Sequence, residues 1–250
     1  MIDWLKFTVP ILHVPLAASG CIVSFDNDGV IEWEKGKRNR FIGSYDDTIG
    51  VRSSGPLNSD GYCTELEIDG NITKFLQGHN VWGSDDHLGL AKSLIEWLIF
   101  KDPNNQVDCP DPFVFLNPKD WVCNRIDITS YADVGSRHNV RTTLDAIALT
   151  GHTKYQRANA TKGTVYFNKN SRRWGFKFYD KFKEVSAAGK AHKIKATAPI
   201  QDLLSKSVES KIRCELVLRQ NEMRDRDIIT LGDLEPLNLF KEYLNRLKFE

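Results

Sequence analysis

The chain has 250 residues, of which 41% are hydrophobic and 27% charged, and its formal net charge is +1. These values are ordinary for a globular protein with one large domain or two small ones. No apolar run reaches the roughly 18 residues that a membrane-spanning helix needs. Residues 1–15 lack the charged start, apolar core and cleavage site of a secretory signal, so we expect neither membrane insertion nor export.

The five cysteines are odd in number and scattered, and no CxxC pair occurs among them: Cys21, Cys63, Cys109, Cys123 and Cys214. The spacing therefore indicates neither a zinc ribbon nor a disulfide framework. Because Cys63, Cys123 and Cys214 lie in strand-like apolar runs, we expect buried, free thiols in a reducing cytoplasm.

The small net charge conceals a strong asymmetry along the chain. Residues 137–195 contain fourteen Lys or Arg and three acids, a net of +11, so the remainder nets −10. A basic segment of this kind suits a phosphate backbone, because neutralised phosphates release counterions. The alternative is a solvated helix face followed by a basic loop.

The first third of the chain is predicted to form β-strands. Residues 2–9 are apolar, and residues 21–25 and 30–33 flank the turn Asp26-Asn27-Asp28-Gly29 as a hairpin would. Residues 62–68 alternate and end at a turn signal.

Two helices are predicted next. A short one is capped by Asn71 or Thr73 and closed by Gly78. A longer one is capped by Ser84 or Asp85, and its apolar residues recur at helical spacing: Leu88, Ala91, Leu94, Ile95, Leu98 and Ile99.

The remaining elements mix both types without a regular βαβ rhythm. We predict strands at 121–129, 164–167, 174–179 and 211–219, helices at 140–149 and 236–247, a short helix after Pro199, and a basic loop at 151–163. No repeat and no nucleotide-binding glycine motif occurs. The pattern predicts an α+β fold with a central, mostly antiparallel sheet flanked by helices.

Two predicted strands carry an arginine and an acid among apolar residues. Arg125 and Asp127 alternate in one strand, and Arg213 and Glu215 alternate in the other, so each pair shares a face. Such a pair can be a structural salt bridge. Alternatively, the acid can bind a metal ion while the arginine binds a phosphate. With Glu67 from an earlier strand, these acids could converge on Mg²⁺ or Mn²⁺.

Two further side chains are candidates for chemistry. His79, between Gly78 and Asn80, is either a metal ligand or, as is commoner for a lone histidine, a structural hydrogen-bonding group. Tyr179 lies among lysines at the end of an aromatic strand, and a phenol that ionises near pH 10 needs such cations to act as a nucleophile. Lys181 could also neutralise charge on a phosphate. The alternative is a tyrosine that only packs its ring.

At these residues the sequence resembles the gene II type replication proteins of filamentous phages, and more distantly the plasmid rolling-circle initiators. The resemblance runs from residues 1–5 to residues 236–240, and its most specific block is residues 74–83. Further blocks match in the same order: Glu67, residues 125–127, Gly151-x-Thr153-Lys154-x-x-Arg157, Tyr179 with Lys181, and residues 213–215.

The resemblance implies a metal-dependent DNA nicking and joining enzyme that begins and ends rolling-circle replication. Tyr179, assisted by Lys181, attacks a phosphodiester, becomes joined to the 5′-phosphate and leaves a 3′-hydroxyl for a polymerase. Mg²⁺ or Mn²⁺ polarises the phosphate. We expect Glu67, His79 and Asp127 to be the metal ligands, with Glu215 as a weaker candidate, and Glu65, on the same face as Glu67, also remains open as a ligand.

The resemblance also implies partners. These are single-stranded or locally melted origin DNA and the helicase and polymerase of a bacterial host, in whose cytoplasm the protein would act. The expected DNA-backbone contacts are basic side chains: Lys154, Arg157, Lys162, Arg172, Arg173, Lys177 and Arg125. Trp174 is expected to stack on exposed bases.

Two departures from the family pattern matter. Family members are longer, so residues 1–250 are expected to form a single catalytic domain that lacks a C-terminal region. No His-x-His pair occurs, so the ligand set is expected to be mixed and acidic. Two other functions remain open: a non-catalytic regulator that binds origin DNA, and a hydrolytic metal nuclease that uses water.

Overall fold

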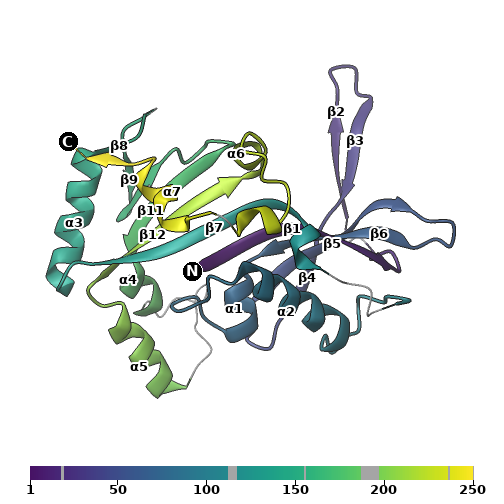
Figure 1. Ribbon diagram of the computed structural model, residues 1–250, viewed down its shortest axis with the longest axis horizontal. Helices are drawn as coiled ribbons and strands as arrows, with labels where there is room; N and C mark the ends of the chain where they lie inside the picture. Colours follow the sequence, from purple (N-terminus) through teal and green to yellow (C-terminus); the bar gives the residue numbers. More distant parts are fainter. Residues whose placement is uncertain (18–19, 112–116, 155, 187–196, 236, 250) are drawn as a thin grey trace.

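A computed structural model describes residues 1–250 except 18–19, 112–116, 155, 187–196, 236 and 250 (Figure 1). Its core is a nine-stranded sheet in the order β4-β5-β6-β1-β7-β12-β11-β10-β9. All neighbouring strands in it are antiparallel. The strands are β4 (Asn39–Ile42), β5 (Thr48–Leu57), β6 (Cys63–Gly70), β1 (Ile2–His13), β7 (Val122–Asp133), β12 (Lys211–Arg219), β11 (Trp174–Asp180), β10 (Thr164–Phe167) and β9 (Asn159–Thr161). The predicted α+β class is confirmed.

The sheet has one apolar face and one polar face, because successive side chains of a strand point to opposite sides. In β1, Leu5, Phe7 and Val9 are fully buried. Helices α1 (Ile72–Gln77) and α2 (His87–Phe100) contribute buried apolar side chains to the same core. The alternate β1 residues, including Trp4 and Lys6, lie on the opposite face, which we call the open face.

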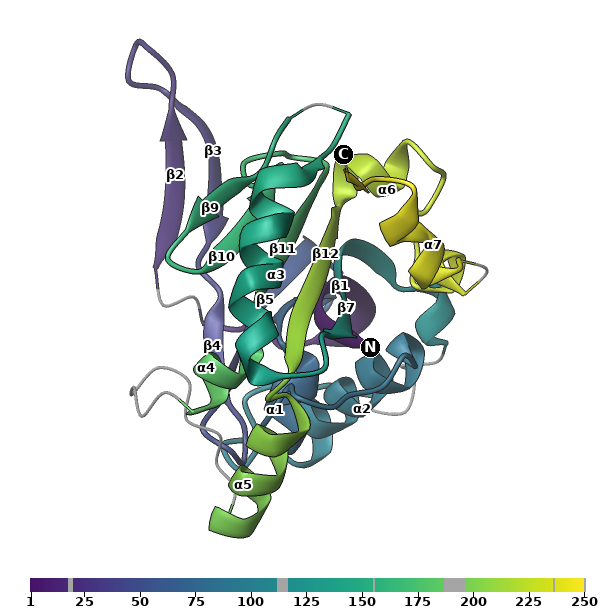
Figure 2. The same ribbon diagram turned by 90° about the vertical axis from the view of Figure 1, so that its left-hand side faces the viewer.

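A third helix covers the apolar face at the other end of the sheet. Helix α3 (Arg137–Thr150) lies alongside β10, β11 and β12 (Figure 2). Its buried residues, Val140 and Leu144, join Phe167 and Phe178 in the core. Arg137 fixes the start of the helix through two hydrogen bonds to Asp180 at the end of β11, of 2.7 and 2.5 Å. Helices α1, α2 and α3 therefore pack on the apolar face of the sheet, and the polar side chains lie on the open face.

Local sequence signals explain the helix ends near the site. The side chain of Asn71 caps α1, and Gly78 closes it with a φ of 82°, which favours glycine. Asp86, rather than the predicted Ser84 or Asp85, caps α2. Asp85 instead lies 2.6 Å from the N-terminal amine. The cap prediction for α2 was therefore wrong by one residue.

Other elements differ from the prediction mainly in extent. The predicted hairpins are confirmed, and β2 (Cys21–Phe25) with β3 (Ile31–Gly36) projects from the body (Figure 1). The predicted loop at 151–163 contains β8 (Gly151–His152), which pairs with β13 (Lys248–Phe249), and the edge strand β9. Strands β4 and β5 were not predicted. The closing helix α7 (Leu239–Leu244) is shorter than predicted.

Short helices complete the described chain: α4 (Lys181–Ser186), α5 (Ala198–Ser207), α6 (Gln220–Arg224), and the 3-10 turns Pro118–Asp120 and Gly232–Leu234. The helix expected after Pro199 is therefore present as α5. The strand-borne cysteines Cys63, Cys123 and Cys214 are free and buried, as expected. Among the described residues, no helix is long and apolar enough to cross a membrane.

Candidate active site

A cavity of about 440 Å³ lies on the open face, where β1, β7, β12 and β11 run side by side. Its lining includes three acids from three different strands and the tyrosine singled out in the sequence: Asp3, Asp127, Glu215 and Tyr179. Lys177, Arg125 and Asn80 line the same cavity. The antiparallel register brings these residues together, although they come from both ends of the chain.

The hydroxyl of Tyr179 donates a hydrogen bond to Oε1 of Glu215. Lys177, directly opposite Glu215 in the register, places Nζ 2.5 Å from the other carboxylate oxygen. The Lys177 ammonium also lies 4.9 Å from the centre of the Tyr179 ring. Burial raises the pKa of Tyr179 well above its usual value, and the charge of Glu215 adds to this effect. The phenol is therefore protonated at neutral pH and needs a base, and Glu215 is the group in contact with it.

Arg213 connects the acids of the cavity. It is fully buried, and its guanidinium lies 2.8 Å from Asp3 and 3.0 Å from Glu215. It also donates to the hydroxyl of Tyr131 at 2.9 Å and to the backbone carbonyl of Asn80. Burial opposes its charge, but the neighbouring Asp3 and tyrosines keep the pKa of Arg213 high. A permanent positive charge therefore underlies the cavity.

Asp3 is a member of this site that the residue patterns did not single out. Its carboxylate accepts hydrogen bonds from Asn71 at 2.7 Å and Asn80 at 2.9 Å. Burial alone would raise the pKa of Asp3, but the Arg213 charge and these amides lower it. The only sequence signal was an acid inside an otherwise apolar run, and a single such residue does not identify a site.

Asp127 is a buried acid of the cavity and forms an ion pair with Arg125. Arg125 binds both of its oxygens, at 2.7 and 2.6 Å. Burial raises the pKa of Asp127 to about 6, and the charges of Glu215 and Asp3 contribute to the increase. The charges of Glu215 and Asp3 therefore add to the effect of burial in disfavouring the ionised form of Asp127, and a hard cation would favour that form. In the part of the chain that the structure describes, however, no three His, Cys, Asp or Glu side chains are grouped closely enough to hold a metal ion.

Lys181 is almost completely buried beside the cavity. Its ammonium donates to Asn80 at 2.9 Å and to Glu184 at 2.6 Å, and it lies 5.9 Å from the centre of the Tyr179 ring. Burial, reinforced by the Arg213 charge, lowers the pKa of Lys181. The structure thus brings together Tyr179 and Lys181, as the sequence predicted.

Two of the predicted metal ligands do not line this cavity. Glu67 is bound by Arg38 and Arg52 at 2.6 Å each, with Lys6 and Lys35 at 3.8 Å. Glu67 pairs with Thr8 of β1, whereas Asp127, on the other side of β1, pairs with Trp4. The two acids are therefore separated by two strand spacings and by four residues along β1, which corresponds to roughly 16 Å.

His79 follows α1, and its Nδ1 lies 3.4 Å from the Gln77 amide. Burial, together with the charge of Lys181, lowers the pKa of His79, so the imidazole is neutral near pH 7. Its neighbour Asn80, rather than His79 itself, lines the cavity.

The predicted DNA contacts divide into separate groups. Lys177 and Arg125 lie in the cavity, and Arg125 and Arg172 line a second, basic cleft. Lys154, Arg157 and Lys162 are exposed near β8 and β9, and Arg173 pairs with Asp225. Trp174 points to the apolar face, where it is 7% exposed and packs on Phe176. The expectation that Trp174 stacks on bases is therefore wrong.

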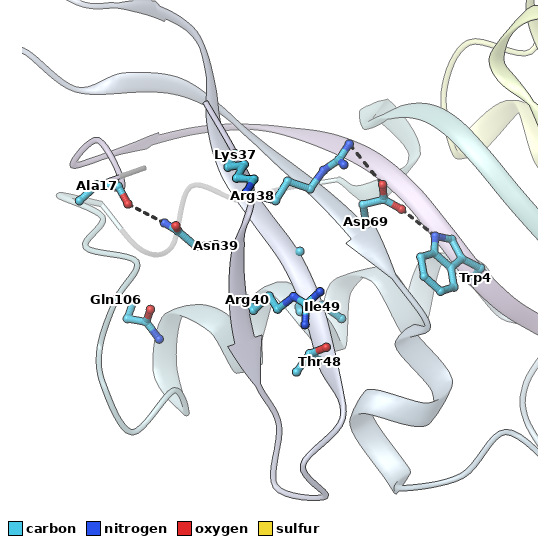
Figure 3. Close-up of a pocket in the computed structure, with 11 residues that line it drawn as sticks. Trp4, Ala17, Lys37, Arg38, Asn39, Arg40, Thr48, Ile49, Asp69 and Gln106 are labelled. Atoms are coloured by element: carbon cyan, nitrogen blue, oxygen red, sulfur yellow. Dashed lines mark hydrogen bonds and ion pairs between the residues drawn. The ribbon is translucent and has the colours of Figure 1, made fainter. Parts of the chain in front are cut away.

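A larger cavity, of about 970 Å³, adjoins the site (Figure 3). Trp4 and Thr48 line both spaces. Basic side chains line the larger one: Lys37, Arg38 and Arg40. Asp69 orients two of the lining groups, since it accepts from Trp4 at 2.7 Å and lies 3.2 Å from Arg38 (Figure 3). A positively charged wall thus lies on one side of the tyrosine-containing cavity.

Comparison with known proteins gives matches of three kinds: a family model, a curated relative and a solved structure. The family model for the N-terminal region of the replication-associated gene II protein matches residues 1–244. The replication-associated gene II protein of Enterobacteria phage I2-2 is 34% identical over 254 residues, which cover 99% of this chain and 72% of that protein. The structure of a rolling circle replication initiator protein from Geobacillus stearothermophilus aligns with all of this chain and 85% of its own, with a TM-score of 0.42 and 13% identity.

Proposed function

Since the chain belongs to the family of the replication-associated gene II protein N-terminal region, we propose that it initiates rolling-circle replication by nicking and rejoining one DNA strand. The observation that carries the chemistry is the contact between the Tyr179 hydroxyl and Glu215, with Lys177 and Lys181 beside the ring. A phenol, a base in contact with it and adjacent cations are the groups that attack on phosphorus requires. We propose that residues 1–250 act as one catalytic domain.

In the proposed reaction, the phenol oxygen of Tyr179 attacks the phosphorus of a phosphodiester and its proton passes to Glu215. The bond from phosphorus to the 3′-oxygen breaks, and that oxygen takes up a proton to become a free 3′-hydroxyl. The 5′-phosphate stays on Tyr179 as a phosphotyrosine ester, so the bond energy is kept for rejoining. Lys177 and Lys181 lower the energy of the extra negative charge that develops on the phosphate oxygens.

We propose that the protein uses Mg²⁺ or Mn²⁺ and that the cavity acids Asp3, Asp127 and Glu215 contribute to its binding. Because these acids are not grouped closely enough to hold the ion by themselves, water or a DNA phosphate oxygen would supply further ligands. Carboxylate oxygens are the donors that these ions prefer. Burial and, to a smaller extent, the charges of Glu215 and Asp3 raise the pKa of Asp127, and this cost of an ionised Asp127 supports cation binding here. When bound, the metal would polarise the scissile phosphate. Glu67 and His79, which the family resemblance suggests as ligands, stay predictions that a binding measurement tests.

The proposed substrate is single-stranded or locally melted origin DNA. A tyrosine held inside a cavity reaches one strand's phosphate, and the adjoining cavity with Lys37, Arg38 and Arg40 offers charges for the backbone on one side. Extension of the 3′-hydroxyl would need a host polymerase and helicase, so we propose that the protein acts in the cytoplasm of a bacterial host.

The test is a covalent adduct. A labelled oligonucleotide that carries the origin is incubated with the protein and Mn²⁺ and run on a denaturing gel. We expect a slow-migrating protein–DNA band with the natural protein and none with Tyr179→Phe, which should still bind DNA. An adduct that persists in Tyr179→Phe would refute the assignment of the nucleophile.

The same gel separates the two other functions. A hydrolytic nuclease that uses water would cut the strand and leave a free 5′-phosphate without any adduct. A non-catalytic origin-binding regulator would neither cut nor form an adduct, and Tyr179→Phe would leave its DNA binding and its biological activity intact.

A further inference from the structure

A second cleft lies on the open face, next to the cavity that contains Tyr179. It measures about 520 Å³, and five basic side chains line it: Lys6, Arg125, Lys169, Arg172 and Arg219. All the other lining residues are uncharged. Arg125 lines both the cleft and the Tyr179 cavity, so the two spaces adjoin. A cleft with five cations and no acid in its lining suits an anion.

The strand register explains why the charges accumulate here. Lys6 on β1 lies opposite Arg125 on β7, and Arg125 lies opposite Arg219 on β12. Three cations therefore form a row across three neighbouring strands, and like charges placed directly opposite one another destabilise a sheet. The turn between β10 and β11 adds Lys169 and Arg172 to the end of this row.

The cations of the row differ in how far acids neutralise them. Asp127 binds Arg125 through both oxygens, and Glu67 lies 3.8 Å from Lys6. For Arg219, by contrast, no ion pair is found within the described residues, and its buried Nη1 has no hydrogen-bond partner there. Gly175, which pairs with Val217 of β12, places no side chain beside this nitrogen: a Cβ there would lie 3.7 Å from it and 3.2 Å from the carbonyl oxygen of Asn168.

The electrostatic environment of Arg219 also favours the binding of an anion in this cleft. Burial lowers the pKa of Arg219, and the neighbouring Arg125 charge lowers it further. A half-buried guanidinium with one unpaired nitrogen beside another cation raises the free energy of the folded chain, and a bound anion would offset that cost.

We propose that this cleft binds a phosphate of the single DNA strand several nucleotides from the phosphate that Tyr179 attacks, with Arg219 as its principal contact. This inference rests on the proposed function for the identity of the anion. Arg213, the partner of Tyr179 in the register, lies six residues from Arg219 on the same strand, which corresponds to roughly 20 Å. The cleft would therefore anchor the strand and fix its direction across the open face, without taking part in the chemistry.

The test measures binding of a fluorescent single-stranded oligonucleotide to the 250-residue chain at several salt concentrations. We expect Arg219→Gln to weaken binding about tenfold at low salt, because a charge-assisted contact is lost. The slope of log affinity against log salt should fall by about 0.7, the value for one phosphate of a single strand. Arg219→Lys should restore most of the slope, because it restores the charge.

Arg141→Gln is the matched control. Arg141 lies on α3, over the opposite face of the sheet, and pairs with Asp145 at 2.8 Å. An unchanged affinity and slope in Arg219→Gln would overturn the proposal, and so would an equal loss in Arg141→Gln. Lys169→Gln, a change in the exposed turn, provides a second variant if Arg219→Gln does not fold, and it should show the same reduced slope.

The two proposals can fail separately. In one outcome, Arg219→Gln binds DNA more weakly as expected, but the natural protein forms no covalent adduct with DNA whichever metal is added. This outcome would support the cleft and refute the nicking reaction. An adduct formed by Arg219→Gln with the oligonucleotide affinity of the natural protein would support nicking and refute the cleft.

Discussion

The hydroxyl group of Tyr179 on β11 donates its hydrogen bond to the carboxylate of Glu215 on β12, the neighbouring strand. This contact holds the phenol in its protonated state, because the negative charge of Glu215 and the burial of the ring both disfavour a tyrosinate. It also gives the departing proton an acceptor. These two consequences have opposite effects on the rate of attack, and substitution of Glu215 distinguishes them.

We expect Glu215→Gln to slow adduct formation by about 10² to 10⁴-fold, the usual contribution of a general base. The amide has the shape of the carboxylate but cannot accept the phenolic proton. If Glu215 only restrains the phenol, its removal should lower the pKa of Tyr179 and increase the rate. Single-turnover kinetics on a labelled origin strand measures the sign, and a faster variant would contradict the proposed base.

Lys181 should matter for charge stabilisation. We expect Lys181→Met to reduce adduct formation by about 10²-fold while DNA affinity changes little, because the buried cation next to the Tyr179 ring is lost and the aliphatic packing is kept. Lys183→Met is the control, since Lys183 is exposed two residues along the same helix. Equal losses in both variants would indicate a general effect of charge on DNA binding.

The choice of metal ligands is tested by direct binding of Mn²⁺, measured by calorimetry in the absence of DNA. We expect Asp127→Asn to weaken binding at least tenfold, since it removes one of the three cavity carboxylates proposed to bind the ion, Asp3, Asp127 and Glu215. Glu67→Gln and His79→Gln should bind Mn²⁺ like the natural protein. A loss of binding in Glu67→Gln would return Glu67 to the ligand set and displace the proposed site.

Glu67 should instead contribute to stability, with a definite dependence on pH. Burial opposes its charge, but Arg52, Lys6 and Arg38 outweigh burial and lower the pKa of Glu67. Because the pKa of Glu67 is lower in the folded chain than in the unfolded chain, its charge stabilises the fold at any pH above the unfolded pKa of ~4.3. This contribution is lost as the pH falls through the pKa of Glu67 in the folded chain.

We therefore expect Glu67→Gln to lower the free energy of unfolding by about 1 kcal/mol at pH 7, because several of the paired cations are reached by solvent. The difference from the natural protein should shrink as the pH falls from the unfolded pKa of glutamate, ~4.3, through the lowered pKa of folded Glu67. Urea unfolding at pH 7, 5 and 3.5 measures it. Glu65→Gln, on the same face of β6, is the control and should change stability by less than about 0.5 kcal/mol. A deficit of the same size at pH 7, 5 and 3.5 would mean that Glu67 acts through packing.

The sequence alone determined most of the strands and the chemistry-bearing residue types. Alternation of apolar and polar residues identified the strand at 211–219 with its observed bounds. The Asn71 cap and Gly78 stop identified α1, because both signals are local. Strands β4 and β5 were missed, since their polar residues and glycines do not alternate clearly and their pairing with β6 depends on distant residues.

Only the tertiary structure decided which polar residues share a site. Glu67 and Asp127 carry the same sequence signal, an acid inside an apolar strand, yet the register places Glu67 among four cations and Asp127 beside Asp3 and Glu215. The row of Lys6, Arg125 and Arg219 likewise exists only through the pairing of three strands. Side-chain type and face are local properties of a strand, whereas its neighbours and register are set by the packing of the whole sheet.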